Sequence, residues 1–382
     1  MRLYGTIGAD LVETTMRKHG NTLRERTLDF VQQMRLEGEP YGRYRYAPCQ
    51  SAPALYSSCY AAMTRHLYGD LDALTDRQRR QWIDYLQSFQ DDDGLFRDRA
   101  IYGQGWYQGE VLWCGPSHLS CHVIIALTCL GATAEKPMRW LDPFTAPGAI
   151  ERWLAERDWV KDVDLTGNEV MNVGTLLQYA RDFQANDEAG RTVETLLAWM
   201  ETHHLNPETG LWGDMDLSDP IQRSRSVQAA YHFWPLWTYD RKPIPHVERA
   251  ADQVLATQNP LGGFGWGSHN GVEPFKSSAC EDIDSIEPLC RFLGQTPYRR
   301  DDILAALRRA RPWVVSNAND DGGFVFMRDR PFEYGHPILA SGVNESAMFP
   351  TWFRTLCLAY LDTALGETAY HFRRCPGYQF GL

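Results

Sequence analysis

Apolar residues recur at helical spacing in six separate stretches of the chain. In one stretch Trp82, Leu86 and Phe89 are three or four positions apart, with Tyr85 beside them, so they fall on one face of a helix. A helix with one apolar and one polar face lies at a protein surface and packs its apolar face inward. The predicted amphipathic helices cover residues 22–34, 75–90, 149–157, 189–203, 245–258 and 299–317.

A polar turn with a glycine and then a large apolar residue follows these helices. The clearest copies are 92–96 (Asp-Asp-Gly-Leu-Phe), 208–212 (Glu-Thr-Gly-Leu-Trp), 261–266 (Leu-Gly-Gly-Phe-Gly-Trp) and 320–324 (Asp-Asp-Gly-Gly-Phe), and weaker copies follow the first and third helices. Glycine ends a helix and permits a tight turn. The turns recur every roughly 50 to 65 residues, which is the spacing of a two-helix repeat with a long connection.

A second helix, more apolar than the first, is predicted after each turn. In residues 120–130 apolar side chains surround the helix axis, and a helix that is apolar nearly all round is buried. These inner helices are predicted at 50–67, 116–130, 167–183, 220–239, 276–293 and 344–365. Alternating outer and inner helices, six of each, predict an all-α fold, a single (α/α)6 barrel. No linker interrupts the series, so residues 1–382 are predicted to be one domain.

Polar residues are concentrated in the first turns of the predicted inner helices. In a barrel of antiparallel helix pairs these first turns share one end, so their side chains would surround one mouth of a central cavity. The residues concerned are Gln50, Ser51, Ser117, His118, His122, Asn168, Glu169, Asn172, Gln222, Arg223, Arg225, Cys280, Glu281, Asp282, Asp284, Asn344, Glu345 and Ser346. Helix capping is the alternative interpretation of Ser117, Asn168, Asn344 and Glu345.

Capping explains Asp284 less well. The helix is predicted to start near Ser277 or Ser278, which places Asp284 beyond the first turn. Pro288 cannot donate to the carbonyl of Asp284, so a free acceptor is expected beside this acid. A carboxyl group inside a buried helix needs a partner or a raised pKa, and such groups in clefts are candidates for function.

Composition limits the partners that the chain can have. The net charge is −11, which argues against nucleic acid or an anionic membrane as the main partner, because both require clustered Lys and Arg. A small-molecule substrate is the partner that this composition allows, and the sequence does not indicate the oligomeric state. Aromatic residues make up 12% of the chain, enough both for a packed core and for a cavity with aromatic walls.

Cysteine usage and the chain's apolar runs bear on its location. The nine cysteines are an odd number without a Cys-x-x-Cys pair, which favours reduced thiols in the cytoplasm. The first five residues do not contain an apolar signal core. The longest apolar run, near 123–130, is too short to span a bilayer, so no integral membrane segment is expected.

Three segments resemble one known family. Residues 278–285 read Ser-Ala-Cys-Glu-Asp-Ile-Asp-Ser, residues 319–324 read Asn-Asp-Asp-Gly-Gly-Phe, and residues 349–359 read Phe-Pro-Thr-Trp-Phe-Arg-Thr-Leu-Cys-Leu-Ala. The first resembles the Asp-x-Asp-Asp motif of class II terpene cyclases, and the others resemble the next turn and the last core helix of that family. The glycine–aromatic turns are similar to the repeats of squalene–hopene cyclases and prenyltransferase β-subunits.

The resemblance implies a protonation-initiated cyclisation of an isoprenoid or oxygenated terpenoid. Asp284 would be the proton donor, supported by Asp282 and the flanking Glu281, and aromatic faces would stabilise the cations that follow. The substrate-binding residues expected around them are His118, Glu169, Asn172, Arg223, Arg225, Tyr231, Trp234, Trp266, Glu345, Phe349 and Trp352. No cofactor is implied, although Mg²⁺ would accompany a diphosphate substrate.

Three other interpretations remain open from the sequence. A glycoside hydrolase or lyase would pair Asp284 with Glu169 or Glu345, and Trp106 and Trp266 would stack on sugar rings. A zinc enzyme of the prenyltransferase type would use Cys280, Asp282 and His336. A toroid that binds a ligand without catalysis is the third, because fold alone does not specify function.

Overall fold

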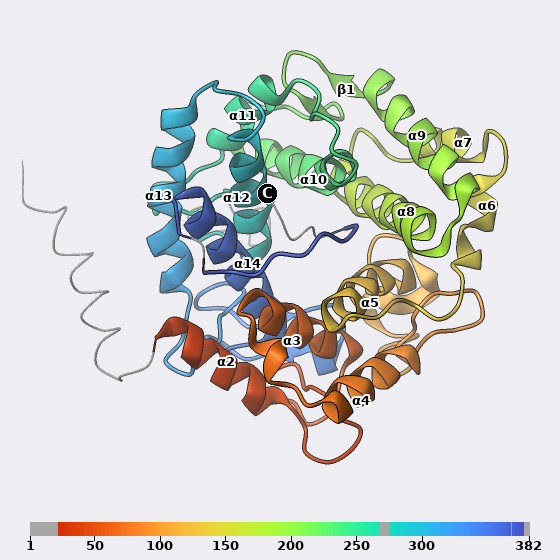
Figure 1. Ribbon diagram of the computed structural model, residues 1–382. Helices are drawn as coiled ribbons and strands as arrows, with labels where there is room; N and C mark the ends of the chain where they lie inside the picture. Colours follow the sequence, from red (N-terminus) through yellow and green to blue (C-terminus); the bar gives the residue numbers. More distant parts are fainter. Residues whose placement is uncertain (1–21, 267–275, 368, 378–382) are drawn as a thin grey trace, which may run out of the picture.

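The computed structural model describes residues 22–266, 276–367 and 369–377, and within them long helices form two concentric rings (Figure 1). The outer helices are α2 (Leu23–Met34), α4 (Asp76–Gln87), α7 (Ala149–Ala155), α9 (Asp187–Thr202), α11 (Val247–Leu255) and α13 (Arg300–Ser316). The inner helices are α3 (Leu55–Leu67), α5 (Pro116–Leu130), α8 (Val163–Gln184), α10 (Pro220–Tyr239), α12 (Ala279–Phe292) and α14 (Met348–Ala364). The predicted all-α (α/α)6 barrel is confirmed.

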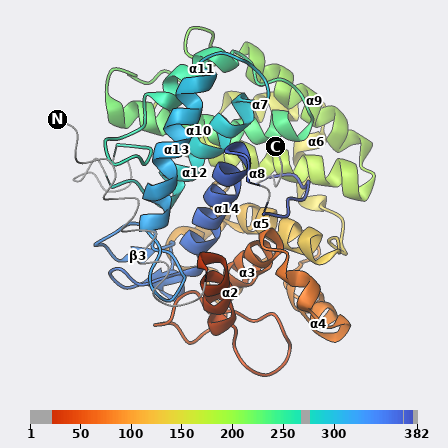
Figure 2. The same ribbon diagram turned by 60° about the vertical axis from the view of Figure 1, so that its left-hand side comes forward.

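The inner helices close a continuous ring. Each packs against the next, and α14 packs against α3 to complete the circle. The turned view in Figure 2 shows α13 outside α12 and α14. Every residue of α5 is buried, as expected of an inner helix, whereas α4 buries only Trp82, Leu86 and Gln87 on its inward face.

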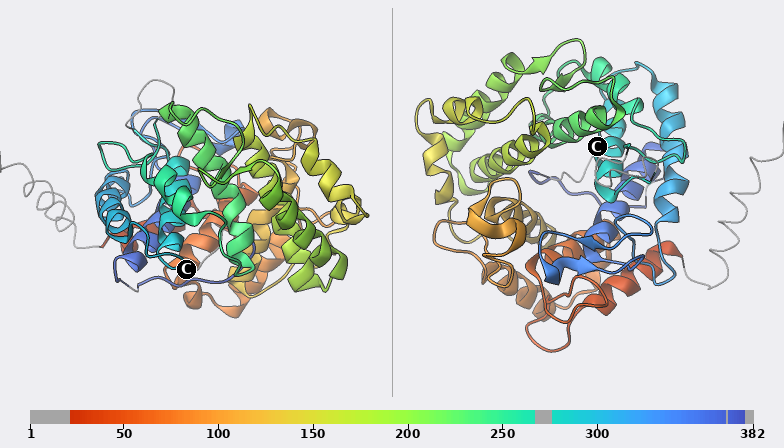
Figure 3. Two further views of the ribbon diagram at one scale, coloured as in Figure 1. Left: turned by 90° about the horizontal axis from the view of Figure 1, so that it is seen from above. Right: turned by 180° about the vertical axis from the view of Figure 1, so that it is seen from behind.

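Short elements complete the connections. They are the helix α6 (Asp142–Thr145), the 3₁₀ turns η2 (Asp70–Ala73), η3 (Gly105–Glu110), η4 (Arg139–Leu141) and η5 (Pro337–Leu339), and two antiparallel strand pairs, β1 (Leu205–Asn206) with β2 (Leu211–Trp212) and β3 (Phe332–Glu333) with β4 (Ala340–Ser341). Figure 3 (right) shows the blue connection before α14 on the side of the ring that faces away in Figure 1.

Some inner helices begin at other residues than the sequence pattern predicts. Helix α3 begins at Leu55 rather than residue 50, and α14 begins at Met348 rather than residue 344. In the second case Asn344 has φ +56° and Ala347 forms an antiparallel bridge with Phe324, so the helix starts after them. Helix α8 begins earlier than predicted, at Val163 instead of residue 167, which adds Asp164 to its first turn.

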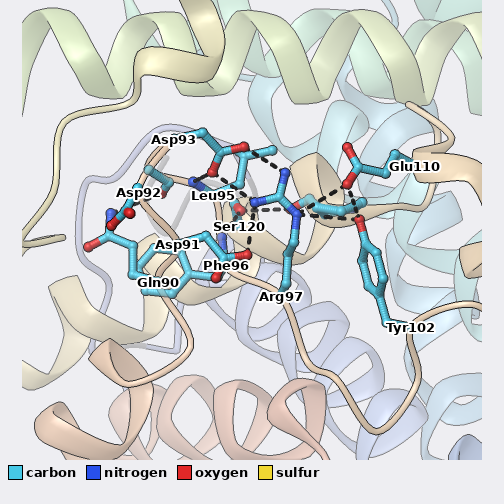
Figure 4. A network of polar contacts seen from close by, with 12 residues as sticks. Gln90, Asp91, Asp92, Asp93, Leu95, Phe96, Arg97, Tyr102, Glu110 and Ser120 are labelled. Atoms are coloured by element: carbon cyan, nitrogen blue, oxygen red, sulfur yellow. Dashed lines mark hydrogen bonds and ion pairs between the residues drawn. The ribbon is translucent and has the colours of Figure 1, made fainter.

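The glycine–aromatic turns fasten each outer helix to the following inner helix. The backbone N–H of Phe96 donates to Ser120 Oγ (2.8 Å), as the contacts of Figure 4 show. The N–H of Phe324 donates to Thr351 Oγ1 (3.0 Å), and the N–H of Phe264 donates to Asp282 Oδ1 (2.9 Å). In three of the four clear copies one backbone donor of the turn is therefore satisfied by a side chain inside the next inner helix.

The C-terminal segment crosses the centre of the ring in Figure 1. Cys375 is buried, and its Sγ contacts Thr128 Oγ1, near the end of α5, at 3.5 Å. Gly377 lies close to Ile125 and Thr175. This segment therefore covers the end of the ring opposite the first turns of the inner helices. Among the described residues, no helix combines the length and apolar character needed to cross a membrane.

Candidate active site

A cavity of about 180 Å³ lies between the first halves of the inner helices. Its lining residues are Trp106, Trp113, Cys114, His118, Asp164, Leu165, Asn168, Gln228, His232, Cys280, Asp284, Phe326, Phe332, Tyr334, Phe349 and Phe353. Its volume lies below the roughly 300–1,000 Å³ that is usual for ligand pockets, so it encloses a small molecule or the reacting end of a longer one.

Four inner helices contribute pairs of residues to this cavity at i and i+4. One helical turn separates the members of a pair, so both side chains point the same way. The pairs are Asp164 and Asn168 on α8, Gln228 and His232 on α10, Cys280 and Asp284 on α12, and Phe349 and Phe353 on α14. The residue midway between the two members is Asp282 on α12 and Thr351 on α14. Each of these side chains accepts a hydrogen bond from the backbone of the preceding glycine–aromatic turn.

Asp284 is the acid of α12 that reaches the cavity. Its side chain is 3% exposed, and no hydrogen bond or ion pair engages its carboxyl group among the described residues. Burial raises the pKa of Asp284 well above its usual value, and the nearby carboxylates Glu281, Glu287 and Asp282 raise it further. Both effects favour the un-ionised carboxylic acid, the form that has a proton to donate.

Glu287 lies one turn deeper on the same helix and forms a buried ion pair with Arg291. Arg291 Nη2 donates to Glu287 Oε1 at 2.6 Å, and the hydroxyl of Tyr231 donates to Glu287 Oε2 at 3.2 Å. The hydroxyl of Tyr360 accepts from Arg291 at 3.0 Å. This buried network places a fixed negative charge beneath Asp284 and opposes loss of its proton.

Asp282 has a different environment although only one residue separates it from Asp284. Its Oδ1 accepts from Ser277 Oγ (2.8 Å) as well as from the turn, and its Oδ2 accepts from Trp313 Nε1 (2.9 Å) and Arg354 Nη1 (2.7 Å). Burial raises the pKa of Asp282, while Arg354 and the other donors act against that effect. A carboxyl group that accepts four hydrogen bonds, one from a guanidinium group, is ionised.

Glu281 caps the helix that carries both acids. The hydroxyl of Ser278 accepts from the N–H of Glu281 (3.2 Å), and a Glu281 oxygen accepts from the N–H of Ser278 (2.9 Å), which is a complete capping box. The predicted start of the helix at Ser277 or Ser278 is confirmed, since Ser278 is the N-cap. Glu281 thus fixes where α12 begins and adds negative charge near Asp284.

The side of the cavity formed by α8 and α10 is polar. Asp164 forms an ion pair with Arg225, with Nη2 to Oδ1 at 2.9 Å. The ring nitrogen Nδ1 of His232 contacts the carbonyl of Gln228 at 2.6 Å, so Nδ1 carries the proton and Nε2 of the neutral ring has a lone pair. Burial lowers the pKa of His232 to about 4, so the ring is neutral at pH 7.

His118, the predicted binding residue on α5, lines the cavity next to the aromatic residues. Its Nδ1 lies 2.8 Å from the hydroxyl of Tyr56. Burial lowers the pKa of His118 well below its usual value, and His122 and His232 lower it further. His118 is therefore also a neutral imidazole, oriented by a buried tyrosine.

Several other predicted binding residues lie outside the cavity lining. Tyr231 and Trp234 are buried, the first against Glu287 and the second against Phe292, and Trp352 is buried beside Phe353. Trp266 is half-buried in the turn before α12. The amide of Asn172 donates to the carbonyls of Leu112 and Trp113, which holds the segment that carries Trp113 at the cavity.

The remaining predicted charges are engaged or lie outside the lining. Glu169 forms an ion pair with Arg157 at 2.9 Å. Glu345 accepts from the backbone N–H groups of Cys49 and Gly342, so it organises the connection before α14. Arg223 is half-buried near the start of α10. His118, Asp284 and Phe349 are thus the predicted catalytic or binding residues that the cavity brings together.

The aromatic wall comes largely from connections. Trp106, predicted to stack on sugar rings in the glycoside alternative, lines the cavity, whereas Phe332, Tyr334 and Trp113 were not predicted. Phe332 and Tyr334 project from the segment around β3, and their rings stack on or tilt against Phe349 at 6.0 and 4.6 Å between centroids. Trp106 and Trp113, in and after η3, pack at 5.1 Å. Alternation of Phe332 and Tyr334 around a polar residue was a signal for one face of a short strand.

A zinc centre is not found at the predicted set. Within residues 22–266, 276–367 and 369–377, no group of three or more His, Cys, Asp or Glu residues could hold a metal ion. The alternative based on Cys280, Asp282 and His336 is therefore wrong for this part of the chain. The physical reason is that Arg354 and three other donors already occupy the oxygens of Asp282.

Comparisons with known proteins agree on the fold. No protein-family model and no curated protein matches the sequence. A solved structure of a glycosidase in complex with glucose is 14% identical, with a TM-score of 0.51, and the match covers 95% of this chain and 99% of that one. The chain is an (α/α)6 toroid.

Two further solved structures have TM-scores of 0.47. One is a type II terpene cyclase from Scytonema in complex with geranylgeranyl dihydroxybenzoate, 12% identical, with 94% of this chain and 99% of that chain covered. The other is a GH76A α-1,6-mannanase from Salegentibacter, 10% identical, with 90% and 98% covered. At such identities the likeness extends to the fold alone.

Proposed function

We propose that the protein is an enzyme that starts a cyclisation by protonating an isoprenoid substrate, in the manner of a class II terpene cyclase. The observation that carries the proposal is the placement of Asp284, a carboxyl group buried in the cavity lining without a hydrogen-bond partner among the described residues, in surroundings that favour its protonated form. Such a group holds a proton that it can pass to a bound substrate where bulk water is excluded, although its raised pKa makes it a weaker acid than an exposed carboxyl group.

The walls around Asp284 suit the cation that such a reaction forms. Phe349 and Phe353 on α14 and the neighbouring Phe326, Phe332 and Tyr334 turn aromatic rings toward the same space. Ring faces carry partial negative charge and stabilise a cation by about 0.5–2 kcal/mol each. The phenylalanine rings also lack the lone-pair nucleophiles that would quench a carbocation early.

The proposed step balances without a cofactor. The O–H bond of Asp284 breaks, its proton adds to a terminal alkene carbon or an epoxide oxygen, and a tertiary cation forms. A second C=C bond of the substrate attacks the cation and closes a ring. Loss of a proton then ends the reaction, and His232, whose ring is neutral, is a base that can accept it. Asp284 regains a proton, so the net reaction is an isomerisation.

The test is turnover in deuterium oxide with a panel of squalene, farnesol, geranylgeraniol and their epoxides and diphosphates, read by mass spectrometry. A cyclised product with one deuterium on the carbon that was protonated is expected from the wild type. Asp284→Asn should lose at least about 10²-fold in rate, as expected when a general acid is removed.

Asp214→Asn is the matched control, because Asp214 is exposed and lies outside the cavity lining. Its turnover should equal that of the wild type. A cyclised product formed at an unchanged rate by Asp284→Asn, or a product without deuterium, contradicts the proposal.

A glycoside hydrolase or lyase is the second candidate, and one observation favours it. Asp164 is a second carboxylate in the lining of the same cavity, whereas the expected partners Glu169 and Glu345 are engaged elsewhere. The glycosidase that shares the fold was solved with glucose bound. Cleavage of a glycan by the wild type, lost in both Asp284→Asn and Asp164→Asn, is the result that favours this candidate.

A further inference from the structure

The charges around the cavity determine which head groups a bound substrate can carry. Among the cavity-lining residues that the structure describes, two are carboxylic acids, Asp164 and Asp284, and none is Lys or Arg. Diphosphate groups in proteins are held by guanidinium or ammonium groups or by a metal ion that carboxylates coordinate. The described part of the chain also does not contain a cluster that could hold a metal.

Arg225, the cation paired with the cavity-lining Asp164, is already neutralised. Arg225 lies 2.9 Å from Asp164 and 3.7 Å from Asp162, so its charge is met by two carboxylates. The ion pair with Asp164 raises the pKa of Arg225, which keeps the pair charged. A diphosphate that entered the cavity would meet the oxygens of Asp164 before the guanidinium group behind them.

The polar side of the cavity offers acceptors. His232 Nε2 has a lone pair, and the amide nitrogen of Asn168 donates to the carbonyl of Asp164 at 3.2 Å, which leaves the amide oxygen of Asn168 to accept. Gln228 lines the same side. Acceptors of this kind match a ligand that donates hydrogen bonds, as a hydroxyl group does, and a fully ionised phosphate group does not.

The opposite side of the cavity is aromatic and suits a hydrocarbon chain. Phe349 and Phe353 on α14 lie across the ring from α8, with Asp284 on α12. We propose that the cavity binds an uncharged isoprenoid that carries a hydroxyl group and that it rejects prenyl diphosphates. In the bound substrate the hydroxyl group lies on the α8–α10 side, and the alkene lies next to the carboxyl group of Asp284. This rests on the proposed function for the identity of the hydrocarbon.

The experiment is calorimetric titration of the full chain at pH 7 with two matched pairs, geraniol against geranyl diphosphate and farnesol against farnesyl diphosphate. Each alcohol is expected to bind at least about tenfold more tightly than its diphosphate, a difference of roughly 1.4 kcal/mol. Addition of EDTA or Mg²⁺ should leave the affinity for the alcohols unchanged.

Two variants separate the charge argument from general effects on the fold. Asp164→Asn removes the carboxylate and releases Arg225, so it should strengthen diphosphate binding by about fivefold or more. Asp162→Asn is the control, because Asp162 also lies near Arg225 but is exposed and outside the lining. It should change neither affinity by more than about twofold.

The outcomes distinguish this inference from the proposed function. Diphosphates that bind the wild type as tightly as the alcohols, or that need Mg²⁺ to do so, overturn the inference while leaving acid-initiated cyclisation intact. Alcohols that bind as expected but are not turned over by the wild type support the inference and count against the proposed reaction. Binding of neither member of a pair overturns the inference.

Discussion

Two aspartates at the start of α12 show how local environment separates structural from chemical roles. Asp282 points away from the cavity, toward the turn after α11 and toward Arg354, whereas Asp284 points into the cavity. Their positions on the helix differ by about 200° at 100° per residue, so they cannot share one face. The first fastens the fold, and the second is free to donate a proton.

Substitution by asparagine should affect the two positions in opposite ways. Asp282→Asn leaves the guanidinium group of Arg354, which is 0% exposed, without its counter-charge, and loss of about 3–5 kcal/mol of stability is expected. Asp284→Asn does not leave a charge unpaired. Urea unfolding of both variants measures the difference, and an Asp282→Asn protein as stable as the wild type contradicts the assigned roles.

The pH dependence of Asp284→Asn has a definite sign. The folded-state pKa of Asp284 is raised, so its protonated form stabilises the fold fully below the unfolded pKa of about 3.9, and this contribution is lost as pH rises through the folded pKa. Asparagine does not titrate. The variant should therefore gain stability relative to the wild type as pH increases, which unfolding curves at several pH values would show.

The sequence identified the acid but not all of its neighbours. Asp284 stood out because a carboxyl beyond the first turn of an apolar helix lacks a capping role. Asp164 was missed because α8 begins four residues before its predicted start. The partner of Asp282 was also not predictable, since Arg354 lies 72 residues further along and reads as part of an apolar helix.

At the scale of elements, the glycine–aromatic turn before α12 packs its backbone closely against the start of that helix. Gly265 has φ +92°, and a Cβ atom there would lie 2.5 Å from Glu281 Oε1. Gly263 is similarly close to Ser277 Oγ and to Trp313 Nε1. The glycines therefore permit both the left-handed backbone and the close approach that brings the turn to the start of α12.

Gly265→Ala should disturb both features at once. The backbone strain of a left-handed alanine is about 1–2 kcal/mol, and displacement of Glu281 from its capping box adds about 1 kcal/mol. Gly366→Ala is the matched control, because Gly366 has φ +101° with nothing within 4 Å of the added Cβ. Thermal unfolding should therefore show a larger loss for Gly265→Ala, and equal losses would contradict the packing argument.

Elements with strong periodicity were predictable, and connections were not. The helices follow from apolar spacing, because that spacing decides which face is buried regardless of partners. The alternation of Phe332 and Tyr334 indicates a short strand, but their contact with Phe349 of α14 depends on the tertiary arrangement and does not follow from the local pattern. Half of the candidate site therefore needed the three-dimensional arrangement.

At the scale of the whole molecule, the ring gathers neutral histidines in its interior. Burial lowers the pKa of His66, His122 and His232 to about 4 in each case, below the usual 6.5. A depressed folded-state pKa gives stability that is present above pH 6.5 and lost as pH falls toward 4.

The chain should therefore lose stability between pH 6.5 and 4, earlier than carboxylate titration alone would cause. Urea midpoints at half-unit intervals of pH measure this. His232→Phe, which removes one of the titrating groups, should make the dependence shallower over that window. An unchanged pH dependence in His232→Phe would contradict the buried neutral state of this ring, because the raised pKa of Asp284 acts in the opposite direction in both proteins.

The most direct test of the account is the protonation state of Asp284 itself, and it does not require a known substrate. An infrared difference spectrum between the wild type and Asp284→Asn at pH 7 isolates the vibrations of this one carboxyl group. The account predicts the carbonyl stretch of an un-ionised carboxylic acid in the wild type, with loss of that band only at alkaline pH. Carboxylate bands at pH 7 in its place would show that Asp284 is already ionised and cannot initiate the reaction.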